Sequence, residues 1–231
     1  MDELSSQLSG LSVSSPALSE NGPHKSLAAM LALGNLERLK VCGDGNCAYY
    51  AAAAAAGPEL LEAAGFWALG HAGSSSTPTD SDLRLQHELR QRVVDWLQQP
   101  ENAQHRYAGT SEAEPVFDPA TGKYEGESPP PASAMERHRA TGTYAQTPQL
   151  RALAELLGRP IVSLDTAQLF DRVPVHSPGG PTARLRSWRR QLAPTLAEGA
   201  TSPPPPLVVM NNGRLDAGGH YDATRRRAAP T

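Results

Sequence analysis

Cysteine, aromatic residues and long apolar runs are all scarce in this sequence. Two cysteines among 231 residues cannot build a disulfide framework, so we expect a reducing compartment and a cytoplasmic location. The longest uninterrupted apolar run, Cys47–Ala56, is far shorter than the roughly 18–20 residues of a membrane helix, so we expect no membrane partner. The N-terminal residues have neither a basic start nor an apolar stretch, which predicts no secretory signal peptide.

An excess of either charge is also missing. Lys and Arg number 21, Asp and Glu number 24, and the net charge is −3, so we expect no nucleic-acid partner. Many of the apolar residues, which make up 39% of the chain, are alanine. The large apolar side chains that remain suffice for one folded domain of roughly 120–170 residues, with unpacked segments beside it.

Metal-binding patterns are lacking around the two cysteines. Cys42 and Cys47 have neither the C-x-x-C spacing nor the paired histidines of a zinc site. The stretch from Asp44 to Asn46 has the start of a calcium loop, but Ala55 stands where the loop needs a bidentate glutamate. We therefore expect no metal.

Glycine and proline, 20 and 21 residues, divide the chain into folded and unfolded stretches. The Ser-rich residues 1–26 predict a disordered leader, which is either a delivery signal for an effector that enters a host cell, a regulatory tail or a segment without function. Residues 27–231 then form the folded domain, with flexible insertions around 109–134 and 171–206.

Apolar spacing predicts an α+β fold with a small sheet. Helices are expected over an apolar run at 27–33, from Asn46–Cys47 to a stop at Gly57-Pro58, over 82–98, and over 148–157 with Thr147 as N-cap and Gly158 as C-cap. Buried strands are expected at 161–164 and 207–210, and a strand at 220–224 antiparallel to the second of these.

Cys47 is the first candidate for chemistry. A glycine-flanked loop runs into an alanine-rich helix at this residue, which places the thiol at a helix N-terminus. There the unpaired N–H groups and the helix dipole favour the thiolate, and successive N–H groups of the loop can face an oxyanion. The alternative interpretation is a buried structural cysteine in a turn.

His220 supplies the base that a nucleophilic cysteine needs. Residues two apart in a strand point to the same face, so Asp222 is expected to lie beside His220 and to orient its ring. Gly218 and Gly219 leave the start of the strand open for a substrate backbone. The alternative is a surface histidine on a hairpin.

Three ordered segments together resemble the OTU (ovarian tumour) family of cysteine deubiquitinases. They are the Cys box Gly43-Asp-Gly-Asn-Cys47, a helix-then-strand stretch from Gly142 to Ile161, and the His box His220-Tyr-Asp-Ala223. The similarity spans roughly residues 36–226. It implies a papain-like OTU fold, with a small central β-sheet between helical regions.

The resemblance also implies a reaction. Cys47 attacks the isopeptide carbonyl after the ubiquitin C-terminus, His220 moves the proton, and Asp222 orients the imidazole. Asp44 shapes the loop and the oxyanion pocket, and the backbone N–H groups of Gly45, Asn46 and Cys47 are the expected oxyanion donors. Ubiquitin or polyubiquitin is then the partner of a monomeric enzyme that needs no cofactor. Its activity is expected to have a bell-shaped pH profile.

The chain departs from the family pattern in a few places, which affect substrate preference. Ala48-Tyr49-Tyr50 follows the cysteine where relatives often carry Leu, an aromatic and a basic residue. Tyr144 stands where Trp is common, and Gln149 replaces a frequent acid. Two alternatives stay open: a ubiquitin-binding pseudoenzyme, and the same thiol chemistry on a ubiquitin-like modifier or a polyprotein junction.

Overall fold

The computed structural model describes residues 27–66, 77–106, 117–118, 123–124, 130–165, 173–179, 182–185, 205–211 and 220–227. The leader at 1–26 and the glycine pair at 218–219 lie outside these residues. The helical elements are α2 Leu27–Leu33, α3 Cys47–Ala63, α4 Asp80–Gln98, η1 Pro100–Arg106, η2 Ala132–Arg139 and α5 Thr147–Leu157. The strands are β1 Leu36–Leu39, β2 Phe117–Asp118, β3 Lys123–Tyr124, β4 Ile161–Asp165, β5 Val173–His176, β6 Thr182–Leu185, β7 Leu207–Asn211 and β8 Tyr221–Arg226.

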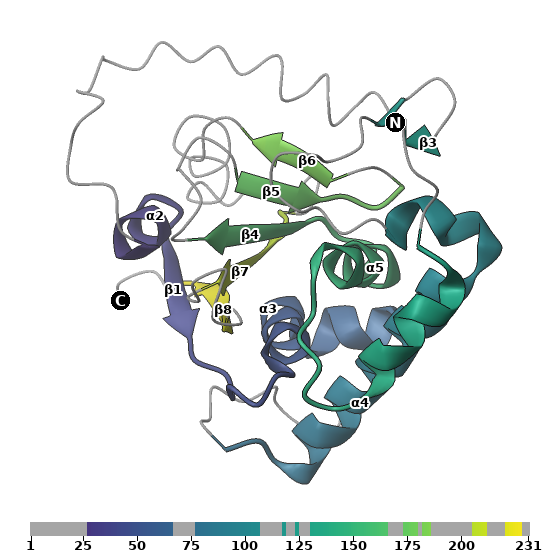
Figure 1. Ribbon diagram of the computed structural model, residues 1–231. Coiled ribbons are helices and arrows are strands. Elements are labelled where there is room, and N and C mark those ends of the chain that lie inside the picture. Colours follow the sequence, from purple (N-terminus) through teal and green to yellow (C-terminus); the bar gives the residue numbers. More distant parts are fainter. Residues whose placement is uncertain are drawn as a thin grey trace.

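Six of these strands form one mixed sheet in the order β1-β8-β7-β4-β5-β6 (Figure 1). β4 and β7 pair in parallel, and the other neighbours pair antiparallel. The α+β prediction is confirmed, and so is the antiparallel pairing of β7 with β8. Because β8 lies between β1 and β7, the last strand of the chain pairs with the first at one edge of the sheet.

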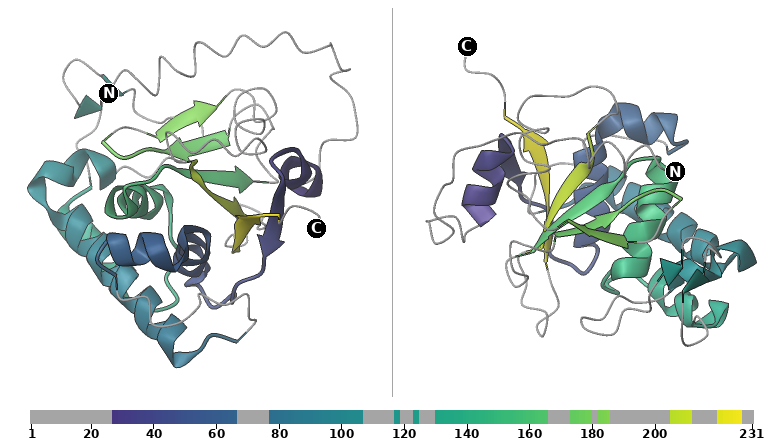
Figure 2. Two further views of the ribbon diagram at one scale, coloured as in Figure 1. Left: turned by 180° about the vertical axis from the view of Figure 1, so that it is seen from behind. Right: turned by 90° about the horizontal axis from the view of Figure 1, so that it is seen from above.

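Alternating side chains of the buried strands divide the core into two layers. Ile161 and Val209 pack with α3, α4 and α5 on one face of the sheet. Val162 and Met210, their neighbours along β4 and β7, pack on the other face with Met30 of α2. Figure 2 shows the sheet from above with α2 on one side and the larger helices on the other. The sheet therefore lies between two helical layers.

Two strands lie within the predicted insertion at 171–206. β5 and β6 lie within this segment and extend the sheet beyond β4. Pro174 stands inside β5 and glycines follow the strand, so the local pattern has the composition of a loop. Pairing with β4 overrides that composition. Within the other predicted insertion, 109–134, β2 pairs with β3, and η2 begins before its end.

Helix boundaries differ from the expected ones in small ways. Gly57 breaks the helical backbone with φ +73, as expected, but a further helical turn follows as far as Ala63. The N-cap of α5 is Gln146 rather than Thr147, because the Gln146 and Gln149 side chains form a reciprocal capping box. Gly158 caps the other end with φ +60, as predicted. None of the helices in the described ranges has the length and apolar character to cross a bilayer.

Candidate active site

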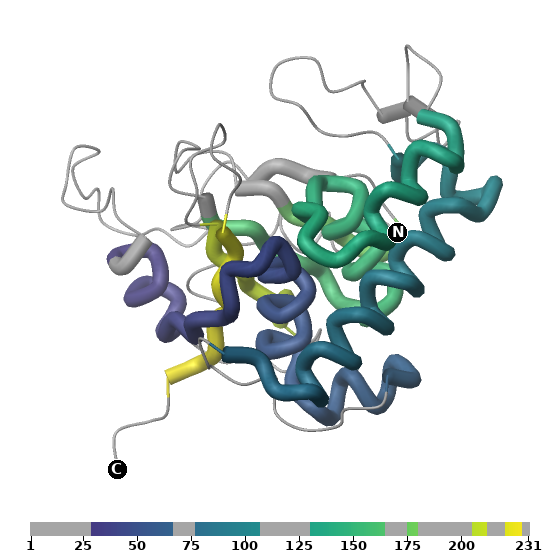
Figure 3. The backbone as a smooth tube through the Cα atoms, turned by 60° about the horizontal axis from the view of Figure 1, so that its bottom comes forward, coloured from purple at the N-terminus to yellow at the C-terminus, as the bar shows by residue number. Residues whose placement is uncertain are grey.

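The three segments singled out in the sequence meet where α3 begins. Cys47 is the first residue of α3, and α3 packs directly against β8. His220 comes immediately before β8, so it lies just outside the strand in which it was expected. Figure 3 shows the chain leading from β1 into α3 beside the strand that carries the His box.

The thiol of Cys47 is buried against the His box. Its side chain is only 2% exposed, and the backbone N–H of Tyr221 donates a hydrogen bond to Sγ at 3.3 Å. The N–H groups of Ala48 and of Cys47 itself also favour the thiolate, as expected for a helix N-terminus. Burial outweighs them and raises the pKa of the Cys47 thiol, which is the opposite of the direction expected from the helix N-terminus alone.

The imidazole of His220 lies between the Cys box and a buried carboxylate. Its Nε2 is 3.0 Å from Oδ1 of Asp222, the contact that the spacing of the two residues predicted. The other ring nitrogen faces the opposite way, since a Cβ built on Gly43 would lie 3.4 Å from Nδ1. Nδ1 therefore remains on the side of the loop that leads to Cys47.

Asp222 is fully buried and is held by more groups than the sequence suggested. Oδ1 also accepts the backbone N–H of Val41 at 3.1 Å, and Oδ2 accepts Nε of Arg38 at 2.6 Å. A second guanidinium nitrogen of Arg38 completes an ion pair with the same carboxylate. Sequence reasoning missed Arg38, because only the pairing of β1 with β8 brings it to a residue 184 positions away.

Asp44 shapes the loop in front of the helix and does not contact His220. Its Oδ1 accepts the N–H of Asn46 at 2.9 Å, and its Oδ2 accepts the hydroxyl of Tyr50 at 3.4 Å. This arrangement corrects one expectation, because the N–H of Asn46 is used inside the loop and is not free for an oxyanion. Burial, followed by the charge of Asp44, raises the pKa of Tyr50, so the phenol stays a proton donor.

Gly45 joins the Cys box to the middle segment of the resemblance. Its φ is +84, and a Cβ at this position would lie 2.3 Å from the carbonyl oxygen of Gly142. Only glycine satisfies both conditions. The N–H of Gly142 in turn donates to Oδ1 of Asn46 at 3.2 Å. The turn at residues 44–46 is therefore packed closely against Gly142, almost a hundred positions away in the sequence.

In the described part of the chain, no three His, Cys, Asp or Glu side chains lie close enough together to hold a metal ion. Gly218 and Gly219, predicted to face the substrate, lie outside the described residues. What the geometry provides is a buried thiol, an imidazole on the adjoining segment and a buried carboxylate behind that imidazole.

Comparison with known proteins adds one structural likeness. No family model matches the chain, and no curated protein matches it. Among solved structures it is similar to the OTU domain of OTUD1, with 20% sequence identity, coverage of 84% of this chain and 89% of that one, and a TM-score of 0.42. A likeness of this strength assigns neither family nor activity, so the chemical interpretation depends on the site geometry.

Proposed function

We propose that this chain is a thiol-dependent deubiquitinase that hydrolyses isopeptide bonds after the C-terminal glycine of ubiquitin. One observation carries the proposal: the consecutive residues 220–222 contain the imidazole, the carboxylate that contacts it and the N–H group that contacts the thiol. His220 contacts the carboxylate of Asp222 through Nε2, while the N–H of Tyr221, between them, donates to Sγ of Cys47. These two contacts support a pairing of the imidazole with the thiol, with the orienting acceptor of the imidazole already bound, as a cysteine nucleophile and its base require.

The first half-reaction forms a thioester. Nδ1 of His220 takes the thiol proton as Sγ of Cys47 attacks the carbonyl carbon of the ubiquitin terminal glycine, and the carbonyl oxygen becomes an oxyanion. We assign the N–H groups of Gly45 and Cys47 to this oxyanion, because that of Asn46 is already bonded to Asp44. The C–N bond then breaks, and His220 returns its proton to the departing lysine amine.

The second half-reaction releases ubiquitin. His220 takes a proton from water, and the hydroxide oxygen attacks the thioester carbonyl carbon. The C–S bond breaks, the ubiquitin C-terminus leaves as a carboxylic acid that ionises in water, and the proton held by His220 returns to the sulfur. In both halves Asp222 stabilises the imidazolium, and Val41 and Arg38 hold its carboxylate in place.

Burial of the sulfur determines the starting state in this scheme. The raised pKa of Cys47 keeps the thiol protonated at neutral pH, so His220 acts as a general base when the acyl group arrives. The reaction does not depend on a preformed thiolate. The position of Cys47 at a helix N-terminus, taken alone, would instead predict a thiolate before the substrate binds.

A panel of diubiquitins covering every linkage tests the proposal, with ubiquitin-like substrates beside it. We expect the wild-type chain to cleave at least one linkage, and Cys47→Ala to cleave none. Binding of ubiquitin without turnover of any chain type would contradict the enzyme and favour a pseudoenzyme. Turnover of a ubiquitin-like conjugate alone would keep the thiol chemistry and change its substrate.

A further inference from the structure

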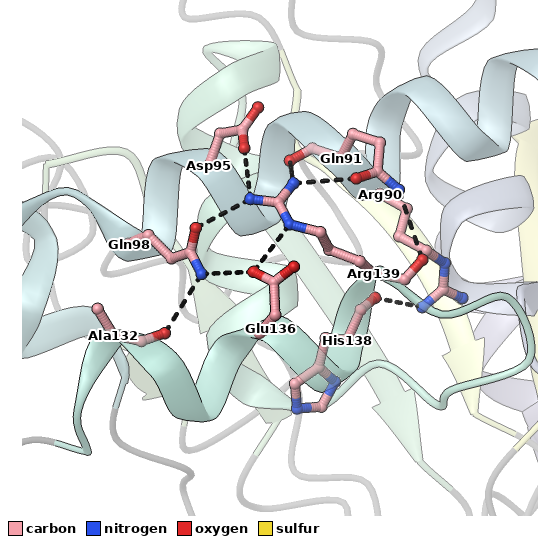
Figure 4. A network of polar contacts seen from close by, with 8 residues as sticks. All are labelled: Arg90, Gln91, Asp95, Gln98, Ala132, Glu136, His138 and Arg139. Atoms are coloured by element: carbon pink, nitrogen blue, oxygen red, sulfur yellow. Dashed lines mark hydrogen bonds and ion pairs between the residues drawn. The ribbon is translucent and has the colours of Figure 1, made fainter.

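Arg90 lies in the middle of α4 with none of its side chain exposed. One guanidinium nitrogen donates to the carbonyl oxygens of His138 at 2.8 Å and Thr143 at 3.0 Å. The other donates to Oδ1 of Asn46 at 2.6 Å and to the carbonyl oxygen of Gly45 at 3.4 Å. Figure 4 shows the contact with His138. A single side chain thus joins the Cys box to the last turn of η2 and to the segment that follows it.

Every hydrogen-bond acceptor of Arg90 is neutral. Among the described residues no carboxylate lies within hydrogen-bond distance of its guanidinium group, and Cζ also lies over the ring of Tyr49, 4.4 Å from the ring centroid. Removing a charge from water without an opposite charge is costly, and arginine keeps its proton even when buried. A positive charge without a contacting counter-ion is therefore fixed inside the fold.

This charge contacts the residues on either side of the nucleophile. Asn46 and Tyr49, two of its contacts, flank Cys47 in the chain. Electrostatic coupling to Tyr49, Asp44 and Cys47 raises the pKa of Arg90 against the larger lowering by burial, so a thiolate at Cys47 favours the charged guanidinium, while the charge of Asp44 raises the pKa of Cys47. No substrate group needs to touch Arg90 for this effect.

We propose that Arg90 is a positioning residue for the thiol chemistry, which clamps the turn at Gly45 and Asn46 and supplies the positive charge opposite the negative charge that forms at Cys47. The inference rests on the proposed function of Cys47 as nucleophile. It assigns to the buried charge a role beyond joining two segments. An arginine that served only as a clamp would work equally well with a carboxylate beside it.

Asn46→Asp separates the charge from the clamp. Aspartate preserves the oxygen that accepts from Arg90 and from Gly142, and the Nδ2 that it replaces has no partner in the structure. The new carboxylate neutralises Arg90 next to the thiol. We expect kcat to fall about 10-fold with KM little changed, and the pH midpoint of Cys47 alkylation to rise by about one unit.

Arg90→Met and Arg90→Lys complete the series, with Arg92→Met as the matched control. Arg92 also lies on α4, also stacks on an aromatic ring, that of Phe66 at 4.1 Å, and also donates to a glycine carbonyl, that of Gly65 at 3.0 Å. It is remote from the Cys box. We expect Arg90→Met to lower kcat by about 10- to 100-fold, Arg90→Lys to recover part of the loss and the alkylation midpoint, and Arg92→Met to behave as wild type.

All variants are compared in a Cys42→Ser background, so that iodoacetamide reports on Cys47 alone, and thermal melts establish that each is folded. The alkylation midpoint is a readout that does not require ubiquitin to be the substrate, so it stands if the proposed function fails. If Asn46→Asp is folded and has the wild-type kcat and midpoint, the charge role is overturned, whether or not Arg90→Met folds. Equal losses in Arg90→Met and Arg92→Met would also overturn it.

Discussion

A buried cation, Arg90, binds the turn that leads into Cys47, whereas a buried anion, Asp222, binds the imidazole of His220. We call residues 44–50 together with Arg90 the nucleophile half of the site. The guanidinium group of Arg90 donates only to neutral oxygens, and two of these belong to Gly45 and Asn46. In the base half, residues 38–41 with 220–222, the carboxylate of Asp222 is paired with Arg38.

The difference between the halves matches the charges that a thiol hydrolase creates. Negative charge forms at sulfur and at the oxyanion, and positive charge forms on the imidazole. Arg38 is 40% exposed, so water screens its effect on Asp222, while Arg90 is fully enclosed. The buried cation of the nucleophile half therefore has no contacting counter-charge, whereas the buried anion of the base half is paired with a partly exposed arginine.

Removing the base is expected to have the largest effect on this comparison. His220→Ala leaves the thiol protonated with no group to take its proton, so we expect diubiquitin turnover to fall by about 10³-fold or more. His87→Ala, on the exposed face of α4, is the matched control and should retain full activity. Turnover by His220→Ala within a few fold of wild type would show that the imidazole is not the base.

The buried anion is tested next. Asp222→Asn keeps the shape of the side chain but removes the charge that stabilises the imidazolium, and we expect kcat to fall about 10²-fold. Arg38→Met leaves the carboxylate bonded to Val41 and His220, so the loss should stay below about 10-fold. Initial-rate kinetics of both variants give the comparison. A larger loss for Arg38→Met than for Asp222→Asn would contradict the roles assigned here.

The packing of the turn at Gly45 is tested by comparing two glycine-to-alanine substitutions. Gly45→Ala meets both a positive φ and a carbonyl oxygen 2.3 Å from the new Cβ, and we expect it to reduce the free energy of unfolding by about 3–5 kcal/mol. Gly57→Ala has a similar φ with nothing within 4 Å, so only the backbone strain of about 1–3 kcal/mol remains. Denaturant titrations measure both. Equal losses would mean that Gly45 does not pack against Gly142 as described.

The raised pKa of Cys47 is expected to change the pH dependence of its alkylation, an effect smaller than those of the preceding substitutions. Burial raises the pKa of Cys47 above its ordinary value of 9.0, so its alkylation should continue to accelerate above pH 9. In a Cys42→Ser background only this thiol reports. A plateau of the alkylation rate between pH 6 and 8 would instead indicate a preformed thiolate and would reverse our description of the free protein.

The free energy of unfolding also depends on pH, so it affects any pH profile of the activity. Burial, reinforced by Arg151, lowers the pKa of His105 from 6.5 to about 4. Between these pH values the unfolded chain binds a proton that the folded chain does not, so stability declines as the pH falls, by up to about 1.4 kcal/mol per pH unit. His105→Gln should reduce this slope, and His87→Gln should not. An unchanged slope in His105→Gln would assign the acid sensitivity to other groups, such as buried His176.

Local patterns in the sequence were sufficient for several parts of the site. The start of α3 at Cys47 follows from glycines before it and alanines after it, and the contact of His220 with Asp222 follows from strand spacing. Both depend on neighbours within a few residues. Strand pairing and packing decide the rest: Arg38 reaches Asp222 only because β1 pairs with β8.

Arg90 illustrates the limit of such patterns most clearly. In the sequence it is one of several arginines in a polar helix, and α4 turns it inward while Arg92 stays partly exposed. Helical spacing places Arg90 on the buried face, four positions before Val94, and turns Arg92 about 200° away from it, but it does not identify the oxygens that bind a buried guanidinium group. β5 was missed for a related reason, because pairing with β4 outweighs the proline inside it.

Labelling by a ubiquitin carrying a thiol-reactive group at its C-terminus tests the central claim, that Cys47 is the nucleophile, most directly. We predict that the probe forms an adduct with the wild-type chain and with Cys42→Ser, that peptide mapping places the adduct on Cys47, and that Cys47→Ala forms none. Labelling that persists in Cys47→Ala, or an adduct mapped to Cys42, would contradict the account.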